Sequence, residues 1–217
     1  MVLAIALSAA FSLDAMARVV DVSDAAISPD GTKIAFVAER SELERNAYDD
    51  ELWTYDLRAG RMRRFASAHR SFSSPQWSPD SMRLAVVSDD RATGNDQLFA
   101  IDPSSGAMRR LTDGTDVDAF AWRPDGTAIA LSRRDPAVVK HGADTYRDGF
   151  AVTDEAYLSL QTPRPIHLWQ VDLAGRAQRL TSGAWSVADA PLSPNHEQTR
   201  RISPLFLLDD PPSARPR

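Results

Sequence analysis

Few side chains in this sequence have the types and spacing that catalysis or metal binding requires. The histidines, His69, His141, His167 and His196, share no metal-ligand spacing such as H-E-x-x-H, so we expect them on the surface or in loops. The chain contains no cysteine, which excludes a thiol nucleophile and cysteine-ligated zinc. No metal site and no cofactor is therefore predicted.

A serine hydrolase would need a nucleophile elbow, G-x-S-x-G, on a strand-to-helix turn. None of the ten glycines belongs to such a motif, and scattered Ser, His and Asp residues do not define a catalytic triad, which depends on mutual geometry. No catalytic residue is predicted, and an enzyme complete in this chain is the least favoured hypothesis.

Acidic residues and one long insert are the remaining candidates for contact with a ligand. Residues 48–51 (YDDE) and 153–155 (TDE) could meet the amino terminus of a peptide, although solvated loops explain such clusters more simply. Residues 141–150 (HGADTYRDGF) lie in the longest insert, and long inserts on a rigid scaffold often carry contacts. The candidates for contact with a substrate or another domain are Tyr146, Arg147 and Asp148. Packing of an extended hairpin is the favoured alternative.

The scaffold that must position these loops is a repeat. The segments SPDGTKIAFVAE (28–39), WSPDSMRLAVVSD (77–89), WRPDGTAIALSRR (122–134) and LSPN (192–195) share one turn. In this turn Pro fixes φ, Asp bonds its own backbone, and Gly takes a positive φ, as a tight hairpin corner requires. The defining residues are Pro29, Asp30, Gly31, Pro79, Asp80, Pro124, Asp125 and Gly126.

Each corner is followed by the same further parts in the same order. An apolar strand comes first, then ELWTYDL (51–57), DQLFAID (96–102) or IHLWQVDL (166–173), a polar turn, and a closing strand at 62–67, 108–113 or 177–182. Four short antiparallel strands that recur at about 40–50 residues are typical of β-propeller blades. The expected fold class is all-β, a partial β-propeller of about three four-stranded antiparallel blades plus a fourth-blade stub. Packing between blades is the expected role of the aromatic residues Trp53, Trp77, Trp122 and Trp169.

The repeat also predicts how the chain is divided. Residues 1–17 form an apolar segment that resembles a signal peptide or a short helix. Residues 18–195 form the partial propeller, with blades at about 26–76, 77–121 and 122–191. Residues 196–217 depart from the repeat, and their Pro- and Arg-rich end is typical of a disordered tail. The localisation stays open: periplasmic or secreted if residues 1–17 belong to a signal peptide, and otherwise cytoplasmic.

Composition narrows the range of partners. Among 217 residues, 25 Lys and Arg stand against 30 Asp and Glu, which gives a net charge of −5 without a long basic run. Nucleic acid is therefore not an expected partner. No apolar stretch reaches the roughly 20 residues that a membrane span needs, and 43% apolar residues suffice for a core.

The blade pattern, W-S-P-D-G followed by I-A-F, L-W, D-L and R-L-T, resembles two related groups: TolB-like propellers and the N-terminal propeller of prolyl-oligopeptidase-family serine peptidases. The segment that leads into the first blade, residues 11–31, and the insert at 144–173 resemble the peptidase group in particular. Within this group the insert resembles the acylaminoacyl-peptidase or dipeptidyl-peptidase branch. This resemblance implies a two-domain enzyme. The propeller restricts access and helps to position peptides, and a separate α/β-hydrolase domain carries the catalytic residues.

Two functions are therefore predicted. The first is the non-catalytic propeller portion of such a peptidase, truncated before the catalytic domain and inactive alone, with a peptide substrate or the absent hydrolase domain as its partner. The alternative is a TolB-like protein-binding module of the cell envelope. Because propellers close with about four to eight blades, three blades and a stub would leave apolar faces uncovered, which also predicts self-association.

Overall fold

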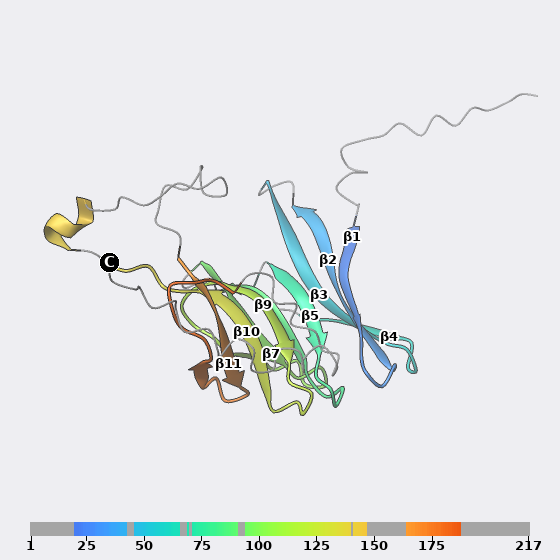
Figure 1. The fold of residues 1–217 in the computed structure, drawn as a ribbon. Coiled ribbons are helices and arrows are strands. Elements are labelled where there is room, and N and C mark those ends of the chain that lie inside the picture. The colour runs from blue at the N-terminus through green and yellow to red at the C-terminus, as the bar shows by residue number, and fades with distance from the viewer. Residues whose placement is uncertain are drawn as a thin grey trace, which may run out of the picture. The chain divides into compact units, whose positions relative to one another are not determined.

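The computed structural model describes residues 20–42, 46–65, 69, 71–90, 94–139, 141–146 and 164–187. Their strands form three four-stranded sheets (Figure 1). The chain divides into two compact units, residues 1–109 and 110–217. The first two sheets lie in the first unit, whose boundary falls within the last strand of the second sheet, and the third sheet lies in the second unit.

The three sheets have the same construction. The first contains β1 (Val20–Ile27), β2 (Lys33–Glu42), β3 (Ala47–Asp56) and β4 (Arg61–Arg64). The second contains β5 (Phe72–Trp77), β6 (Leu84–Asp90), β7 (Asn95–Ile101) and β8 (Met108–Arg110). The third contains β9 (Val117–Trp122), β10 (Ala128–Arg134), β11 (Ile166–Asp172) and β12 (Ala177–Arg179), with a 3-10 helix, η2 (Gly142–Tyr146), between β10 and β11.

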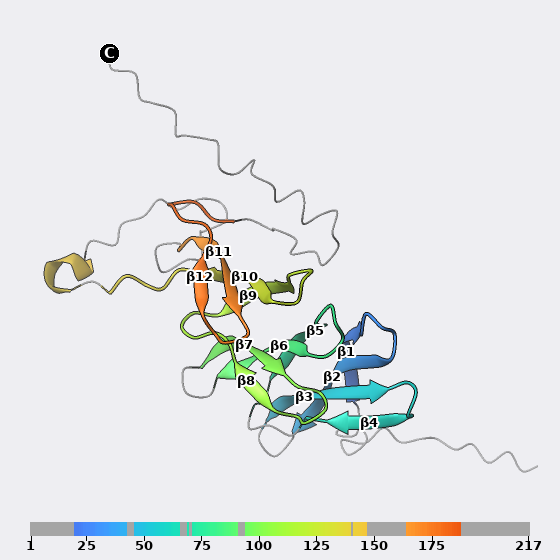
Figure 2. The same cartoon turned by 90° about the horizontal axis from the view of Figure 1, so that it is seen from below.

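In every sheet the strands neighbour one another in chain order, and Figure 2 shows this order for the third sheet. Neighbouring strands pair antiparallel within β1–β4, β5–β7 and β9–β12. This arrangement is that of propeller blades, and the predicted all-β fold class is confirmed. The segments 1–17, 192–195 and 196–217 lie outside the described residues. The first strands of the second and third sheets begin at Phe72 and Val117, ahead of the predicted blade starts at 77 and 122.

The repeated corner is a tight turn stabilised by its own side chains. In the first sheet the N–H of Gly31 donates to the carbonyl of Ser28 (2.8 Å), and Gly31 has a φ of 67°. The Ser28 hydroxyl (2.6 Å) and the N–H of Thr32 (3.0 Å) both donate to Asp30 Oδ1. Together they lower the pKa of Asp30 to about 2. The sequence S-P-D-G therefore specifies this turn locally.

The turn between the third and fourth strands is closed by an aspartate in every sheet. Asp56 Oδ1 accepts the N–H groups of Arg58 (2.9 Å) and Ala59 (2.8 Å). Asp102 accepts the hydroxyls of Ser104 and Ser105. In the third sheet Asp172 accepts the N–H groups of residues 174 and 176. The recurring Asp after each apolar–aromatic pair is thus a turn residue.

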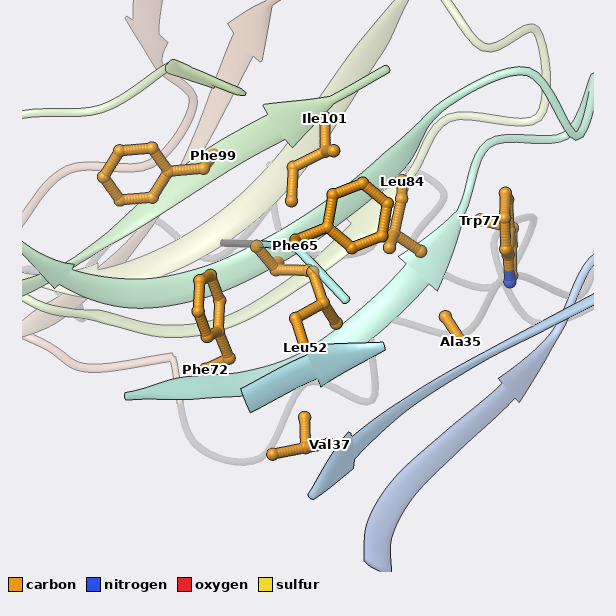
Figure 3. Close-up of a cluster of buried hydrophobic side chains, with 10 residues drawn as sticks. Ala35, Val37, Leu52, Phe65, Phe72, Trp77, Leu84, Phe99 and Ile101 are labelled. Carbon is orange, nitrogen blue, oxygen red and sulfur yellow. The ribbon is translucent and has the colours of Figure 1, made fainter. Parts of the chain in front are cut away.

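The first two sheets pack face to face through a buried apolar cluster (Figure 3). Val37 and Leu52 of the first sheet pack with Leu84 and Ile101 of the second, and all four are almost fully buried. Trp77 lies at one end of the cluster, and its ring N–H donates to the carbonyl of Ala26 (3.0 Å). Because both faces of β6 are covered, its sequence is continuously apolar over residues 84–87.

Candidate functional site

The residues selected from the long insert fall mostly outside the described chain. Tyr146 is the last residue of η2. Arg147, Asp148 and the acidic residues 153–155 lie outside the described residues. The described part of HGADTYRDGF is thus a short 3-10 helix, and the proposed contact role of these side chains stays a prediction.

The acidic stretch at 48–51 is part of β3 and not of a loop. Asp50 lies opposite Glu39 of β2. Burial, reinforced by repulsion from the carboxylates of Glu39, Asp49 and Asp24, raises the pKa of Asp50 above its ordinary value. Within the described residues no group of acidic and histidine side chains has an arrangement that could hold a metal ion.

Glu51, at the centre of β3, is the hub of a polar network. It accepts Arg40 Nε (3.3 Å), Arg64 Nη1 (2.6 Å) and the ring N–H of Trp53 (3.1 Å). Arg64 reaches Glu51 because β4 pairs with β3 in a register that places it opposite Trp53. Trp53 is half-buried, and its polar edge is satisfied by this carboxylate. The network therefore stabilises the sheet and leaves Trp53 no free donor for a ligand.

The third sheet carries a different network at the corresponding positions. By the repeat, His167 corresponds to Glu51, Asp135 to Arg40 and Arg179 to Arg64. Arg179 Nη2 donates to Asp135 Oδ2 (3.0 Å), and His167 Nε2 lies 3.4 Å from the same oxygen. We call these three residues the His167 cluster. In the first sheet the carboxylate of this network, Glu51, is on the third strand. In the third sheet the carboxylate, Asp135, directly follows the second strand, and the third strand has His167 at the position of Glu51.

His167 is fully buried, which corrects the expectation that the histidines lie on the surface or in loops. Its Nδ1 lies 3.2 Å from the Thr181 hydroxyl, and that hydroxyl accepts the N–H of Leu168 (2.9 Å). Trp185 packs edge-on against the imidazole at 5.8 Å between ring centroids. The Asp135 carboxylate faces Nε2, and the Thr181 hydroxyl faces Nδ1.

Thr181, His167 and Asp135 thus form a hydroxyl–imidazole–carboxylate chain, the order of groups in an acyl-transfer triad. Two observations argue against catalysis. His167 has no solvent-accessible surface. A general base must come within hydrogen-bond distance of the substrate, and a buried imidazole cannot. The Thr181 oxygen is also engaged by the Leu168 N–H, where a nucleophile needs a free approach. The contacts of Thr181 and Asp135 with His167 are therefore structural.

The His167 cluster leaves three buried polar atoms without a hydrogen-bond partner: His167 Nε2, Asp135 Oδ1 and Trp169 Nε1. The 3.4 Å contact between His167 and Asp135 is close enough for electrostatic attraction but lacks the alignment of a hydrogen bond. The Trp169 ring instead contacts the guanidinium of Arg133, 4.0 Å from its centroid, and that of Arg179 at 5.8 Å. Trp169 has lost the carboxylate partner that Trp53 retains.

The other aromatic residues of the repeat serve packing. Trp77 and Trp122 are the last residues of β5 and β9, and both are buried. Trp122 pairs with Ile129 across the third sheet. The corner turns that precede β2, β6 and β10 contain the defining residues of the repeat: Pro29, Asp30, Gly31, Pro79, Asp80, Pro124, Asp125 and Gly126. In the described part of the chain none of these residues is arranged with others as a catalytic site.

Residues 18–137 match the family model of the TolB beta propeller domain. The chain belongs to this TolB propeller family. The match covers the first two sheets and extends into the third, in agreement with the blade topology. Within the described residues no helix has the length and apolar character needed to cross a bilayer.

This TolB propeller chain is also similar to peptidases. It is 27% identical over 174 residues to the uncharacterized peptidase YuxL of Bacillus subtilis, which covers 80% of this chain and 25% of YuxL. The AtxE2 isopeptidase has the same fold over 77% of this chain and 31% of its own, with a TM-score of 0.60 at 18% identity. The acylaminoacyl peptidase of Pyrococcus horikoshii matches 75% of this chain and 25% of its own, with a TM-score of 0.54 at 17% identity. The chain spans about a quarter of the length of YuxL.

Sequence reasoning missed the His167 cluster, although one signal was available. In IHLWQVDL, His167 alternates with Trp169 and Val171, and alternate residues of a strand share a face. This period predicts that His167 lies among buried residues. Its partners could not be found in the same way, because Asp135 and Arg179 reach it only through the register of β10 and β12 on β11.

Proposed function

We propose that this chain is the non-catalytic propeller portion of a prolyl-oligopeptidase-like serine peptidase. In the whole enzyme it gates access and positions peptides for a separate α/β-hydrolase domain, and alone it is inactive. The observation that carries this proposal is the identity with a peptidase over 80% of this chain, at only a quarter of that peptidase's length. The rest of such a protein leaves ample room for a hydrolase domain.

Inactivity is supported by the site. The one hydroxyl–imidazole–carboxylate chain found among the described residues is closed to substrate, because His167 has no exposed surface. The purified 217-residue chain should therefore release no chromophore from N-acetyl-alanine p-nitroanilide above the buffer rate. Turnover that disappears on treatment with a fluorophosphonate would contradict the proposal.

Gating requires a test within a whole enzyme. Residues 18–187 are to replace the matching segment of YuxL. The chimera is compared with the rest of YuxL alone, its proposed hydrolase domain, on short and long acyl-peptides. We expect the chimera to discriminate against long peptides and the isolated hydrolase domain to discriminate less. Equal selectivity in the two proteins would argue against a gating role while leaving the fold assignment intact.

A TolB-like binding module of the cell envelope is the second candidate, and the family match over residues 18–137 favours it. In this case the chain acts through protein contacts and needs no hydrolase domain. Cross-linking in cells distinguishes the two: recovery of a defined envelope protein supports the binding module, and recovery of a hydrolase supports the peptidase.

A further inference from the structure

A cleft of about 750 Å³ opens between the first and second sheets, within the first compact unit. It lies at the end of the sheets that carries the corner turns and the aspartate-closed turns. Its walls include Lys33, Arg61 and Arg63 from the first sheet and Ser81, Met82 and Pro103 from the second.

Strand register explains why cations gather in the cleft. Lys33, Asp56 and Arg61 lie opposite one another on β2, β3 and β4. By the two-residue period of strands they share a face with Val37 and Leu52, which pack on the second sheet. This face is therefore apolar over the buried cluster and cationic at its outer end.

The two carboxylates that line the cleft are occupied by their own turns. Asp56 Oδ1 accepts two backbone N–H groups, from Arg58 and Ala59. Asp102 accepts the hydroxyl and N–H of Ser104 together with the hydroxyl of Ser105. These hydrogen bonds hold both carboxylates in the turns. From its turn Asp56 attracts Arg61 and Lys33 at longer range.

The three cations of the cleft make no close ion pair among the described residues, and they outnumber its two carboxylates. Lys33 is half-buried, and its Nζ lies 5.8 Å from the centroid of the Trp77 ring. Within the described chain neither the Lys33 ammonium nor the Arg61 guanidinium makes a hydrogen bond or a close ion pair. Asp56, whose pKa is lowered by the N–H groups of Ala59 and Arg58 and then by the charges of Arg61 and Lys33, attracts both cations at longer range. Arg63 donates to the carbonyls of residues 103, 104 and 105 at 2.6–2.8 Å, which leaves its charge without a carboxylate. A half-buried ammonium beside two guanidinium groups favours an anion.

The cleft also offers a neutral donor and apolar walls. The Ser81 oxygen accepts the N–H of Asp30 (3.1 Å), so its hydroxyl proton is available to a ligand. Met82 is largely exposed, and with Pro103 it supplies apolar surface beside the cations. A ligand that fits both features carries a carboxylate next to a short apolar group.

We propose that this cleft binds a carboxylate that bears a short apolar substituent, with Lys33 and Arg61 as its charge partners and Met82 and Pro103 against the substituent. Such a group occurs at the C-terminal residue of a peptide and in a free branched carboxylic acid. The inference does not depend on the peptidase assignment, because binding can be measured in this chain without any hydrolase domain.

The test is calorimetric titration of the 217-residue chain with N-acetyl-L-leucine and with N-acetyl-L-leucinamide, which differ only in the charged group. We expect the acid to bind at least about tenfold more tightly than the amide, since a charge-assisted hydrogen bond contributes roughly that factor. Titration with 4-methylpentanoate distinguishes the two sources. Tighter binding of N-acetyl-leucine supports a peptide end, and equal or tighter binding of 4-methylpentanoate supports a free acid.

Variants locate the binding in the cleft. Lys33→Gln combined with Arg61→Gln should weaken binding of the acid about tenfold or more. Arg58→Gln is the matched control, because it removes a cation from the same turn at a position that does not line the cleft, and it should leave the affinity unchanged. Absence of binding to the parent chain, equal binding of acid and amide, or an unaltered affinity in the double variant would each overturn the proposal.

Discussion

At the residue scale, the contrast between Glu51 and His167 shows how one substitution changes the demands on its neighbours. Glu51 satisfies two guanidinium groups and an indole N–H at once. An imidazole cannot accept from all three, and in the third sheet Asp135 takes over as the acceptor for Arg179. Trp169 Nε1 is left buried and unpaired, a cost that the cluster must offset through its other contacts.

The Asp135 carboxylate is expected to contribute to stability. Asp135→Asn removes the charge that faces both His167 and Arg179 while keeping the volume of the side chain. Because His167 is fully buried, we expect the free energy of unfolding in urea to fall by about 1–3 kcal/mol. Asp113→Asn changes an exposed aspartate of the same unit and should alter it by less than about 0.5 kcal/mol. Equal effects of the two substitutions would mean that the His167 cluster contributes nothing to stability.

At the element scale, the turns couple stability to pH. The corner carboxylate Asp30 has its pKa lowered to about 2 by the Ser28 hydroxyl and the Thr32 N–H. The pKa of Asp80 is lowered by the Ser78 hydroxyl and the Met82 N–H, and that of Asp125 by the hydroxyl and N–H of Thr127. A pKa that is lower in the folded state stabilises the fold above the unfolded value of about 3.9. This stabilisation is lost as the pH falls through the folded pKa.

We therefore expect the urea midpoint to be nearly constant above about pH 5 and to fall between about pH 4 and pH 2. Asp30→Asn should reduce the size of this fall, because the amide does not titrate. Asp21→Asn, at an exposed position of β1, is the control and should leave the profile as it is. A parent profile that is flat down to about pH 2 would show that the turn hydrogen bonds do not persist in solution.

Arg63 joins the first sheet to a turn of the second. Its guanidinium donates to three carbonyls of that turn, and a Cβ at Gly106 would lie 2.5 Å from Nη2. Arg63→Met keeps the aliphatic stem and removes the donors. We expect a loss of about 1 kcal/mol in the free energy of unfolding, a modest value because the contacts are exposed to solvent. Arg58→Met is the control. An equal loss of unfolding free energy in this variant would mean that the contact of Arg63 with the turn has no specific effect on stability.

The elements themselves could be predicted from sequence, and their contacts could not. S-P-D-G and the aspartate of each later turn specify local structure within a few residues, so that the blade order follows from the sequence alone. The His167 cluster joins Asp135 to a histidine beyond the long insert, and the cleft needs side chains from two packed sheets. Local periodicity predicts single strands, but it does not predict which side chains meet across a long insert or between two packed sheets.

At the scale of the whole chain, the outer face of the first sheet carries an apolar row across all four strands. Ile27 lies opposite Ile34, Ile34 opposite Tyr55, and Tyr55 opposite Met62. By strand alternation this row is on the face that points away from the second sheet. Ile27 is 67% and Met62 58% exposed. An apolar row with two exposed and two half-buried members on a sheet face favours association with another apolar surface.

We therefore expect the 217-residue chain to self-associate, and Ile27→Lys combined with Met62→Lys to shift it toward the monomer. The two lysines oppose association because burying an unpaired ammonium is costly. Val138→Lys with Val139→Lys adds the same charge at two highly exposed apolar positions outside the row and should leave association unchanged. Size-exclusion chromatography with light scattering measures the outcome. A parent chain that stays monomeric at every concentration and melts cooperatively would mean that this face is not an association surface, and the row would then need another explanation.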